Sequence, residues 1–115
     1  MSVTLANIAV DCTNAKSLAT FWAAVLSTEV DAEANEFFAT IKSAAGPTLM
    51  FLQVPEPRNG KNRLHLDLAA TDWAAEVDRI VGLGAKRVDE HNEYGTHWIT
   101  LADPEGNVFD IADHH

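Results

Sequence analysis

His65, Asp67 and Asp110, all in the second half of the chain, are the residues whose types could carry out chemistry. An imidazole beside a carboxylate can act as a general acid–base pair, and this makes His65 and Asp67 the catalytic candidates. The simplest interpretation is structural, with a half-buried histidine that is hydrogen-bonded to Asp67 or Asp110 in a polar wall. Because the sequence does not fix the distances, both interpretations stay open.

A turn and a strand are expected to position Asp110. In Asp103-Pro104-Glu105-Gly106, aspartate suits the first position of a type I turn, proline the second, and glycine closes it. The strand that follows, about Asn107 to Ala112, alternates its side chains between two faces. Asp110 should therefore point away from Phe109 and Ile111.

The first strand of this half shows the same alternation. His65, Asp67 and Ala69 alternate with Leu64, Leu66 and Leu68, which predicts one polar face and one apolar face. We expect the leucines to face a helix and the polar residues to face away from it.

Each half of the chain repeats one order of signals: a strand, an amphipathic helix and three short strands. Thr13 or Asn14 caps the first helix and Asp72 the second, and Gly84 suits the left-handed residue that ends the second. The first helix should bury Leu18, Phe21, Trp22, Val25 and Leu26, and the second Trp73, Val77, Ile80 and Val81. The later strands are expected at about Glu29–Ala32, Phe37–Lys42 and Thr48–Val54, then Lys86–Asp89, His97–Leu101 and Asn107–Ala112.

The length and composition fit one α+β domain made of two such βαβββ modules. The chain has 115 residues, of which 47% are hydrophobic and 22% charged, enough for a single core. Module 1 should cover about residues 1–56 and module 2 about 63–113, joined by a linker at about 55–62 that is rich in Pro, Gly and Asn.

The net charge of −9 argues against two classes of partner, nucleic acids and anionic membrane surfaces, because it repels both. Neither a signal peptide nor a membrane-spanning segment is recognisable, so we expect a cytoplasmic location. The single cysteine, Cys12, fits that compartment and is interpreted as a small core side chain. His114 and His115 at the end of the chain are not interpreted as a site.

The chain resembles the vicinal oxygen chelate superfamily, and most closely its small glyoxalase-like proteins. Three segments carry the resemblance: 61–68, with Leu64-His65-Leu66-Asp67-Leu68, then Leu83-Gly84-Ala85, then Asp103–Asn107. This superfamily includes glyoxalase I, extradiol dioxygenases, fosfomycin-modifying enzymes and bleomycin-binding proteins. The resemblance covers almost the whole chain. It implies two βαβββ modules whose curved mixed sheets form a cleft, with the helices outside, and usually a homodimer.

In metal-using members of that superfamily, the first and last strands of each module supply His, Gln or Glu ligands. The matching positions here are Asn7, a residue near Phe51 or Gln53, His65 and Asp110. Only His65 and Asp110 are strong ligands for Zn, Ni, Mn or Fe, whereas an open catalytic site generally needs about three protein ligands. Asp67 or Gln53 could complete the set. Lys42, Arg63 and Lys86 show no sign of convergence as a substitute for a metal.

Aromatic residues are expected beside these carboxylates. By alternation, Trp98 and Thr100 share the face of Asp110, while Ile99 and Leu101 face the helix. Aromatic faces next to carboxylates suit a flat or cationic ligand. Further expected ligand-binding residues are Phe51, Gln53, Asp67 and Asn7, with Phe38 as an alternative to Phe51.

Other residues are interpreted as structural. Trp22 and Trp73 lie on the helical stripes and should pack in the core, and Glu90 to Tyr94 should form an exposed loop. His97 alternates away from Trp98 and has no partner that the sequence identifies.

Two functions follow from these expectations. The first is metal-free binding of a small cationic or aromatic molecule, as in drug-binding proteins of the superfamily. The second is a metal-dependent lyase, isomerase or dioxygenase that uses His65 and Asp110 as ligands. The sequence does not identify the ligand, and it does not say whether the cleft forms within one chain or across a dimer.

Overall fold

Residues 5–42, 46–56, 60, 62, 64–93 and 95–113 are described in the computed structural model of this chain. Two units are present, Met1–Arg58 and Asn59–His115. Outside the described residues lie part of the expected linker (57–59 and 61), Arg63, Tyr94, His114 and His115. No helix in the described ranges is long and apolar enough to span a membrane.

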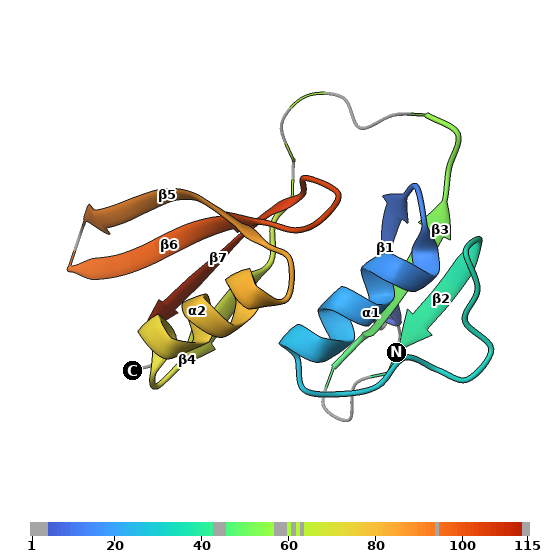
Figure 1. Cartoon of the computed structure of the whole chain (residues 1–115), viewed down its shortest axis with the longest axis horizontal. Coiled ribbons are helices and arrows are strands. Elements are labelled where there is room, and N and C mark those ends of the chain that lie inside the picture. The colour runs from blue at the N-terminus through green and yellow to red at the C-terminus, as the bar shows by residue number, and fades with distance from the viewer. Residues whose placement is uncertain are drawn as a thin grey trace. The chain divides into compact units, whose positions relative to one another are not determined.

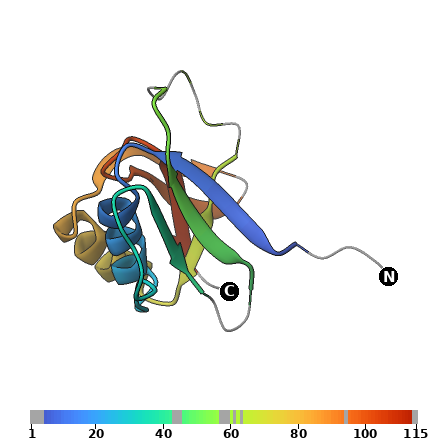
Figure 2. The ribbon, with the colours of Figure 1, turned by 90° about the vertical axis from the view of Figure 1, so that its right-hand side faces the viewer.

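The first unit contains a three-stranded sheet and one helix (Figures 1 and 2). Strand β3 lies in the centre, parallel to β1 and antiparallel to β2. Helix α1 packs against β2 and β3, and the Asn14 side chain caps it by accepting a hydrogen bond of 3.0 Å from Ser17 N. The elements are β1 (Asn7–Cys12), α1 (Ala15–Val25), β2 (Phe38–Ile41) and β3 (Thr48–Gln53).

The core of this unit confirms most of the predicted helical stripe. Leu18, Phe21, Trp22 and Val25 are buried. Leu26 is 44% exposed, because the helix ends at Val25 and Leu26 is its C-cap residue. The sheet contributes Ala39, Ile41, Leu49 and Phe51 to the same core, and Cys12 is buried as expected.

The strand predicted at Glu29–Ala32 is wrong, since the described residues there form no strand and the first unit is therefore βαββ. A single backbone hydrogen bond of 3.0 Å runs from Asp31 N to Thr40 O in β2. The Thr40 hydroxyl donates to the Asp31 carboxylate. Asp31 thus bonds to β2 at Thr40 by its side chain as well as its backbone, without the series of backbone bonds that a paired strand would form.

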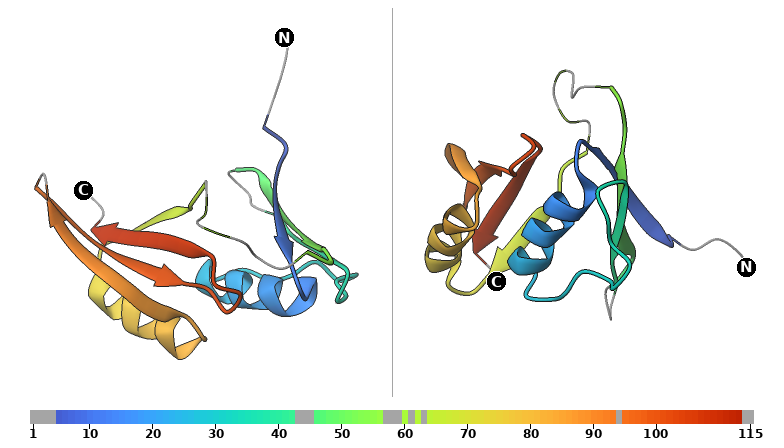
Figure 3. Two further views of the ribbon diagram at one scale, coloured as in Figure 1. Left: turned by 90° about the horizontal axis from the view of Figure 1, so that it is seen from above. Right: turned by 45° about the vertical axis from the view of Figure 1, so that its right-hand side comes forward.

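The second unit has the predicted βαβββ order, with a four-stranded mixed sheet ordered β4-β7-β6-β5 (Figures 1 and 3). Strand β4 is parallel to β7, while β6 is antiparallel to β7 and β5. The elements are β4 (Asp67–Ala70), α2 (Trp73–Gly82), β5 (Lys86–Glu93), β6 (Thr96–Ala102) and β7 (Val108–Asp113). The two mixed sheets confirm the predicted α+β class.

Two boundaries in this unit differ from the predictions. Strand β5 continues to Glu93, so Glu90 to Glu93 belong to a strand rather than to a loop. Strand β4 begins at Asp67 and not at Leu64, whose side chain is 71% exposed. The expectation that Leu64 faces the helix is wrong, because Leu64 precedes the paired part of the strand.

Helix α2 is held at both ends by the predicted residues. Ala75 N donates to the Asp72 carboxylate over 3.4 Å, and Gly84 has a φ of +125° just after the C-cap Leu83. Val77 and Ile80 are buried, whereas Val81 is 37% exposed. The buried stripe is therefore narrower than that of α1.

The sheet of the second unit has one apolar face and one polar face, as predicted. Ile99, Leu101, Phe109 and Ile111 are all at most 3% exposed, and α2 packs against β7 and β4. Trp98, Thr100 and Asp110 alternate with these residues and are partly exposed. The face that carries them is called the polar face below.

The turn before β7 is built around Asp103, which is 4% exposed. Gly106 N donates to Asp103 O over 2.9 Å, as a type I turn requires. The Asp103 carboxylate accepts hydrogen bonds from Glu105 N (2.9 Å), Asn107 N (3.0 Å) and Asn107 Nδ2 (3.2 Å). These bonds set where β7 begins.

Asp103→Ala is therefore expected to lower the free energy of unfolding by about 1 to 3 kcal/mol, since it leaves these donors without their acceptor. Urea unfolding followed by circular dichroism measures the loss. Asp103→Asn is the matched control, because it keeps the Oδ1 acceptor and should cost less. Equal losses for the two variants would contradict this role.

Candidate functional site

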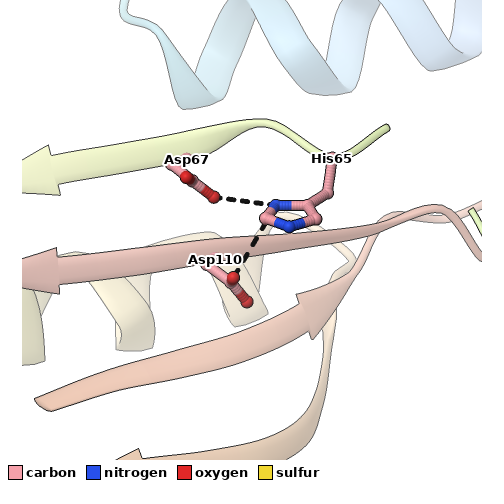
Figure 4. Close-up of side chains that lie close together, drawn as sticks. All are labelled: His65, Asp67 and Asp110. Carbon is pink, nitrogen blue, oxygen red and sulfur yellow. Dashed lines mark hydrogen bonds and ion pairs between the residues drawn. The ribbon is translucent and has the colours of Figure 1, made fainter. Parts of the chain in front are cut away.

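His65, Asp67 and Asp110 come together on the polar face of the second unit (Figure 4). Asp67 on β4 lies directly opposite Asp110 on β7 in the parallel ladder. A backbone hydrogen bond of 3.0 Å from Asp110 N to Leu66 O extends this pairing beyond the strand. The extension keeps His65, two residues before Asp67, beside the same pair.

The imidazole contacts both carboxylates through one nitrogen. His65 Nδ1 lies 2.8 Å from Asp67 Oδ1 and 3.7 Å from Asp110 Oδ2. An ionised carboxylate only accepts hydrogen bonds, so the contact with Asp67 selects the imidazole form with hydrogen on Nδ1. His65 Nε2 then has no hydrogen-bond partner among the described residues. It is the ring atom that a ligand could meet.

Exposure divides the three side chains into an outer and an inner part. The side chain of Asp67 is 71% exposed and that of His65 is 50% exposed, whereas that of Asp110 is 23% exposed. Thr100 Oγ1 donates to Asp110 Oδ1 over 2.6 Å. Asp110 therefore has one oxygen fixed by Thr100 while the other faces His65, so its carboxylate is the most closely positioned of the group.

Thr100→Val is expected to lower the free energy of unfolding by about 0.5 to 1.5 kcal/mol, because it removes the hydroxyl that donates to Asp110 but keeps the branched shape. Thr100→Ser is the matched control and should keep most of the stability. Urea unfolding of the two variants, followed by circular dichroism, would test this. If valine and serine had the same effect, the hydrogen bond to Asp110 would have no role.

An aromatic pair lies on the same face as this group. The rings of Trp98 on β6 and His91 on β5 are stacked, with centroids 4.9 Å apart and planes at 20°. His91 Nε2 lies 3.5 Å from Asp89 Oδ2. His91 is a site residue that the sequence did not indicate, because Glu90 to Tyr94 has the composition of an exposed loop. The alternation of Asp89, His91 and Glu93 was the signal that could have found it.

The site residues expected in the first half do not come together. Asn7 and Gln53 are both exposed, but they lie at opposite ends of the β1–β3 ladder, where Asn7 is opposite Thr48 and Gln53 is opposite Cys12. Five residues of strand correspond to about 16 Å. Gln53 Nε2 donates to Thr13 O over 3.0 Å, so its amide helps to hold the start of α1.

Phe51, expected at the ligand, lies instead in the core of the first unit. Its side chain is 1% exposed and shares a face of β3 with the buried Leu49. Phe38 is 43% exposed on β2. A hollow of about 480 Å³ lies next to Phe38 and is lined by residues 31–35, 38–40 and 42, and no motif in the sequence indicated it.

His97 has partners that the sequence did not identify. Its Nε2 lies 2.6 Å from Glu90 Oε2, and its ring meets Trp73 edge-on with centroids 4.7 Å apart. Glu90 also pairs with Arg87 at 3.4 Å. These contacts tie the start of α2 to β5 and β6, which makes His97 a structural residue and confirms packing for Trp73.

The chain matches the family model described as "Glyoxalase-like domain" over residues 7–112. No curated protein shows significant sequence similarity to it. Solved structures do share its fold. A glyoxalase/bleomycin resistance protein/dioxygenase family enzyme from Burkholderia phytofirmans PsJN has a TM-score of 0.81 at 16% identity, with 96% of this chain and 98% of that chain covered.

Two further structures are similar along nearly their whole length. A glyoxalase-related enzyme from Fulvimarina pelagi has a TM-score of 0.76 at 17% identity and covers 96% of this chain and 88% of its own. Lactoylglutathione lyase from Agrobacterium tumefaciens has a TM-score of 0.68 at 16% identity, with 97% and 94% covered. These structures show the shared fold, and the family match shows that the chain belongs to the glyoxalase-like domain family of the vicinal oxygen chelate superfamily.

Proposed function

We propose that this protein binds a small cationic or aromatic molecule on the polar face of its second unit, at His65, Asp67 and Asp110. The observation that carries the proposal is the charge balance of this group. Two carboxylates lie within reach of a single imidazole, and neither pairs with a lysine or arginine among the described residues. Even with His65 protonated, the group keeps one negative charge.

The surroundings of the group favour a cation over an anion. The whole chain carries a formal charge of −9, which attracts small cations and repels anions over a distance set by the salt concentration. Asp67 is exposed enough to meet a ligand first, and Asp110 is positioned to receive it. The stacked rings of Trp98 and His91 supply a flat apolar surface nearby.

Isothermal titration calorimetry with a panel of organic ammonium and amidinium compounds tests this proposal, with neutral compounds of the same shape as controls. We expect the cations to bind more tightly than their neutral counterparts, and the difference to shrink as salt is raised from 50 to 500 mM (about 14 to 4 Å screening length). The absence of binding at high micromolar concentration across the panel would refute the proposal.

A metal-dependent enzyme is the second candidate, because the three side chains also have the types and the spacing of a metal-ligand set. One imidazole nitrogen and two carboxylate oxygens lie within 4.8 Å of one another. This is the number of protein ligands that an open catalytic metal site needs, and its oxygen-rich composition suits Mn or Fe(II) as well as Zn. When bound there, a divalent ion would supply a Lewis acid that polarises a substrate oxygen.

In that case His65, Asp67 and Asp110 would hold the ion, and Thr100 would orient Asp110. Metal analysis of protein purified without chelators distinguishes the two candidates. The metal candidate predicts about one ion per chain and a higher melting temperature on adding Zn, Ni, Mn or Fe(II). If no ion were bound and the melting temperature did not change, the metal-dependent enzyme would be excluded and binding of an organic ligand would be retained.

The open edges of both sheets bear on how the two units and two copies of the chain associate. We infer that the two units act as one domain and that the chain forms homodimers. The open edges β1, β2, β4 and β5 favour such pairing within the described sheets. Light scattering that gave the mass of a monomer would refute the dimer. We keep the cytoplasm as the proposed location, because a chain with a single cysteine cannot form an internal disulfide.

A further inference from the structure

The polar face of the second unit is organised in two rows that cross its four strands. Residues opposite one another in a ladder share a face, so the pairing registers define these rows. The first row is Asp67, Asp110, Thr100 and Asp89, on β4, β7, β6 and β5 in that order. The second row is Ala69, Ala112, Trp98 and His91, on the same strands.

The two rows have complementary chemistry at a short separation. Positions two residues apart on a strand are about 7 Å apart, so the rows are neighbours. The first row offers three carboxylates, and the His65 imidazole lies beside two of them. In the second row, two alanines with small side chains adjoin the stacked rings of Trp98 and His91. The small side chains of Ala69 and Ala112 thus form a low apolar floor that continues the row of Trp98 and lies next to the row of Asp67 and Asp110.

We propose that the ligand carries both features in one molecule, a planar aromatic ring and an attached ammonium or amidinium group. The ring occupies the floor over Ala69 and Ala112 against Trp98, and the cation meets Asp67 and Asp110. This inference rests on the proposed function, and it assigns His91 as a specificity-determining residue. His91 fixes the plane of Trp98 by stacking on it, and thereby sets the surface that a ring meets.

A ligand that has only the cationic group or only the aromatic ring contacts only one of the two rows favourably. An aliphatic ammonium ion pairs with the carboxylates but packs poorly against a flat ring, whereas a neutral aromatic compound leaves the carboxylates without a counter-charge. Contact between aromatic rings adds about threefold to tenfold in affinity beyond simple burial. A charge-assisted hydrogen bond adds a comparable or larger factor, because ionised partners bond about twice as strongly as neutral ones.

Three probes of nearly the same size separate these contributions: 2-phenylethylamine, 2-cyclohexylethylamine and 2-phenylethanol. In calorimetric titrations of the full chain, we expect 2-phenylethylamine to bind about threefold to tenfold more tightly than 2-cyclohexylethylamine. The affinity of 2-phenylethylamine should exceed that of 2-phenylethanol by at least the same factor. In His91→Ala the difference between the two amines should shrink, because Trp98 is no longer held in its plane, and 2-phenylethylamine should lose more affinity than 2-cyclohexylethylamine.

The indole N–H resonance of Trp98 provides a second measurement that does not depend on a variant. It should shift on titration with 2-phenylethylamine and move less with the cyclohexyl compound. Equal affinities for the two amines, or an unchanged Trp98 signal, would overturn the aromatic row while leaving the cation site in place. If neither amine bound, the proposed function itself would fail.

Discussion

Asp110→Asn is expected to weaken binding of 2-phenylethylamine by about tenfold to a hundredfold, the effect of losing a hydrogen bond between charged partners. Asp110 is the innermost carboxylate of the group, and it is oriented by Thr100. Asparagine keeps the size and one oxygen but removes the charge. Asp67→Asn should have a smaller effect, because the side chain of Asp67 is 71% exposed and solvent screens its charge.

Asp78→Asn is the matched control for Asp110→Asn. Asp78 lies with an exposed side chain on helix α2, which packs on the apolar face of the sheet, so its replacement removes the same net charge away from the polar face. Its affinity should match that of the wild type within about twofold if only long-range attraction is lost. An equal loss in Asp78→Asn and Asp110→Asn would mean that the overall charge of −9, rather than a site, causes the binding.

Phe51→Ala is expected to lower the free energy of unfolding by about 3 to 5 kcal/mol, the usual cost of removing a large buried aromatic side chain. The prediction follows from the 1% exposure of Phe51 in the core under α1. Urea unfolding measures this loss. Affinity for an organic cation should be unchanged under conditions in which the variant is folded, because Phe51 does not belong to the polar face of the second unit.

Phe37→Ala is the control for this variant, since Phe37 is 60% exposed. Its loss of stability should be below about 1 kcal/mol, as for most surface substitutions. The opposite pattern, with little loss of stability but a large loss of binding in Phe51→Ala, would restore the sequence-based expectation that Phe51 lies at the ligand.

The contrast between Phe51 and Asp110 explains which parts of the site could be predicted. On β7, one set of alternate residues is apolar and the other contains Asp110, so the buried face follows from composition. On β3 both sets are apolar, with Leu49 and Phe51 on one face and Met50 and Leu52 on the other. Alternation alone could not decide which of these faces meets the helix.

Turn and cap residues made the fold predictable, because their preferences are local. Asp103, Gly106, Asp72 and Gly84 take the expected positions. Local preferences did not decide the segment Glu29–Ala32, which forms no strand. Whether such a short polar segment pairs with a neighbour depends on long-range contacts, and here Asp31 bonds to Thr40 by its side chain.

The convergence of Asp67 with His65 and Asp110 could be suggested from the sequence but not established. Alternation places His65 and Asp67 on one face, yet the register between β4 and β7 decides which residue of β7 meets them. That register is a property of the folded sheet. The stacked pair of His91 and Trp98 depends in the same way on the register between β5 and β6, which contains an irregularity between Arg87 and Asp89.

Nuclear magnetic resonance of the ¹⁵N-labelled protein, titrated with 2-phenylethylamine, tests most directly whether the polar face of the second unit is the binding site. We expect saturable shifts at His65 to Asp67, at Trp98 to Thr100 and at Asp110 to Ala112, and their loss in Asp110→Asn. If the largest shifts instead occurred around the hollow at Asp31 to Asn35, while the resonances of His65, Asp67 and Asp110 did not move, the proposed site would be wrong.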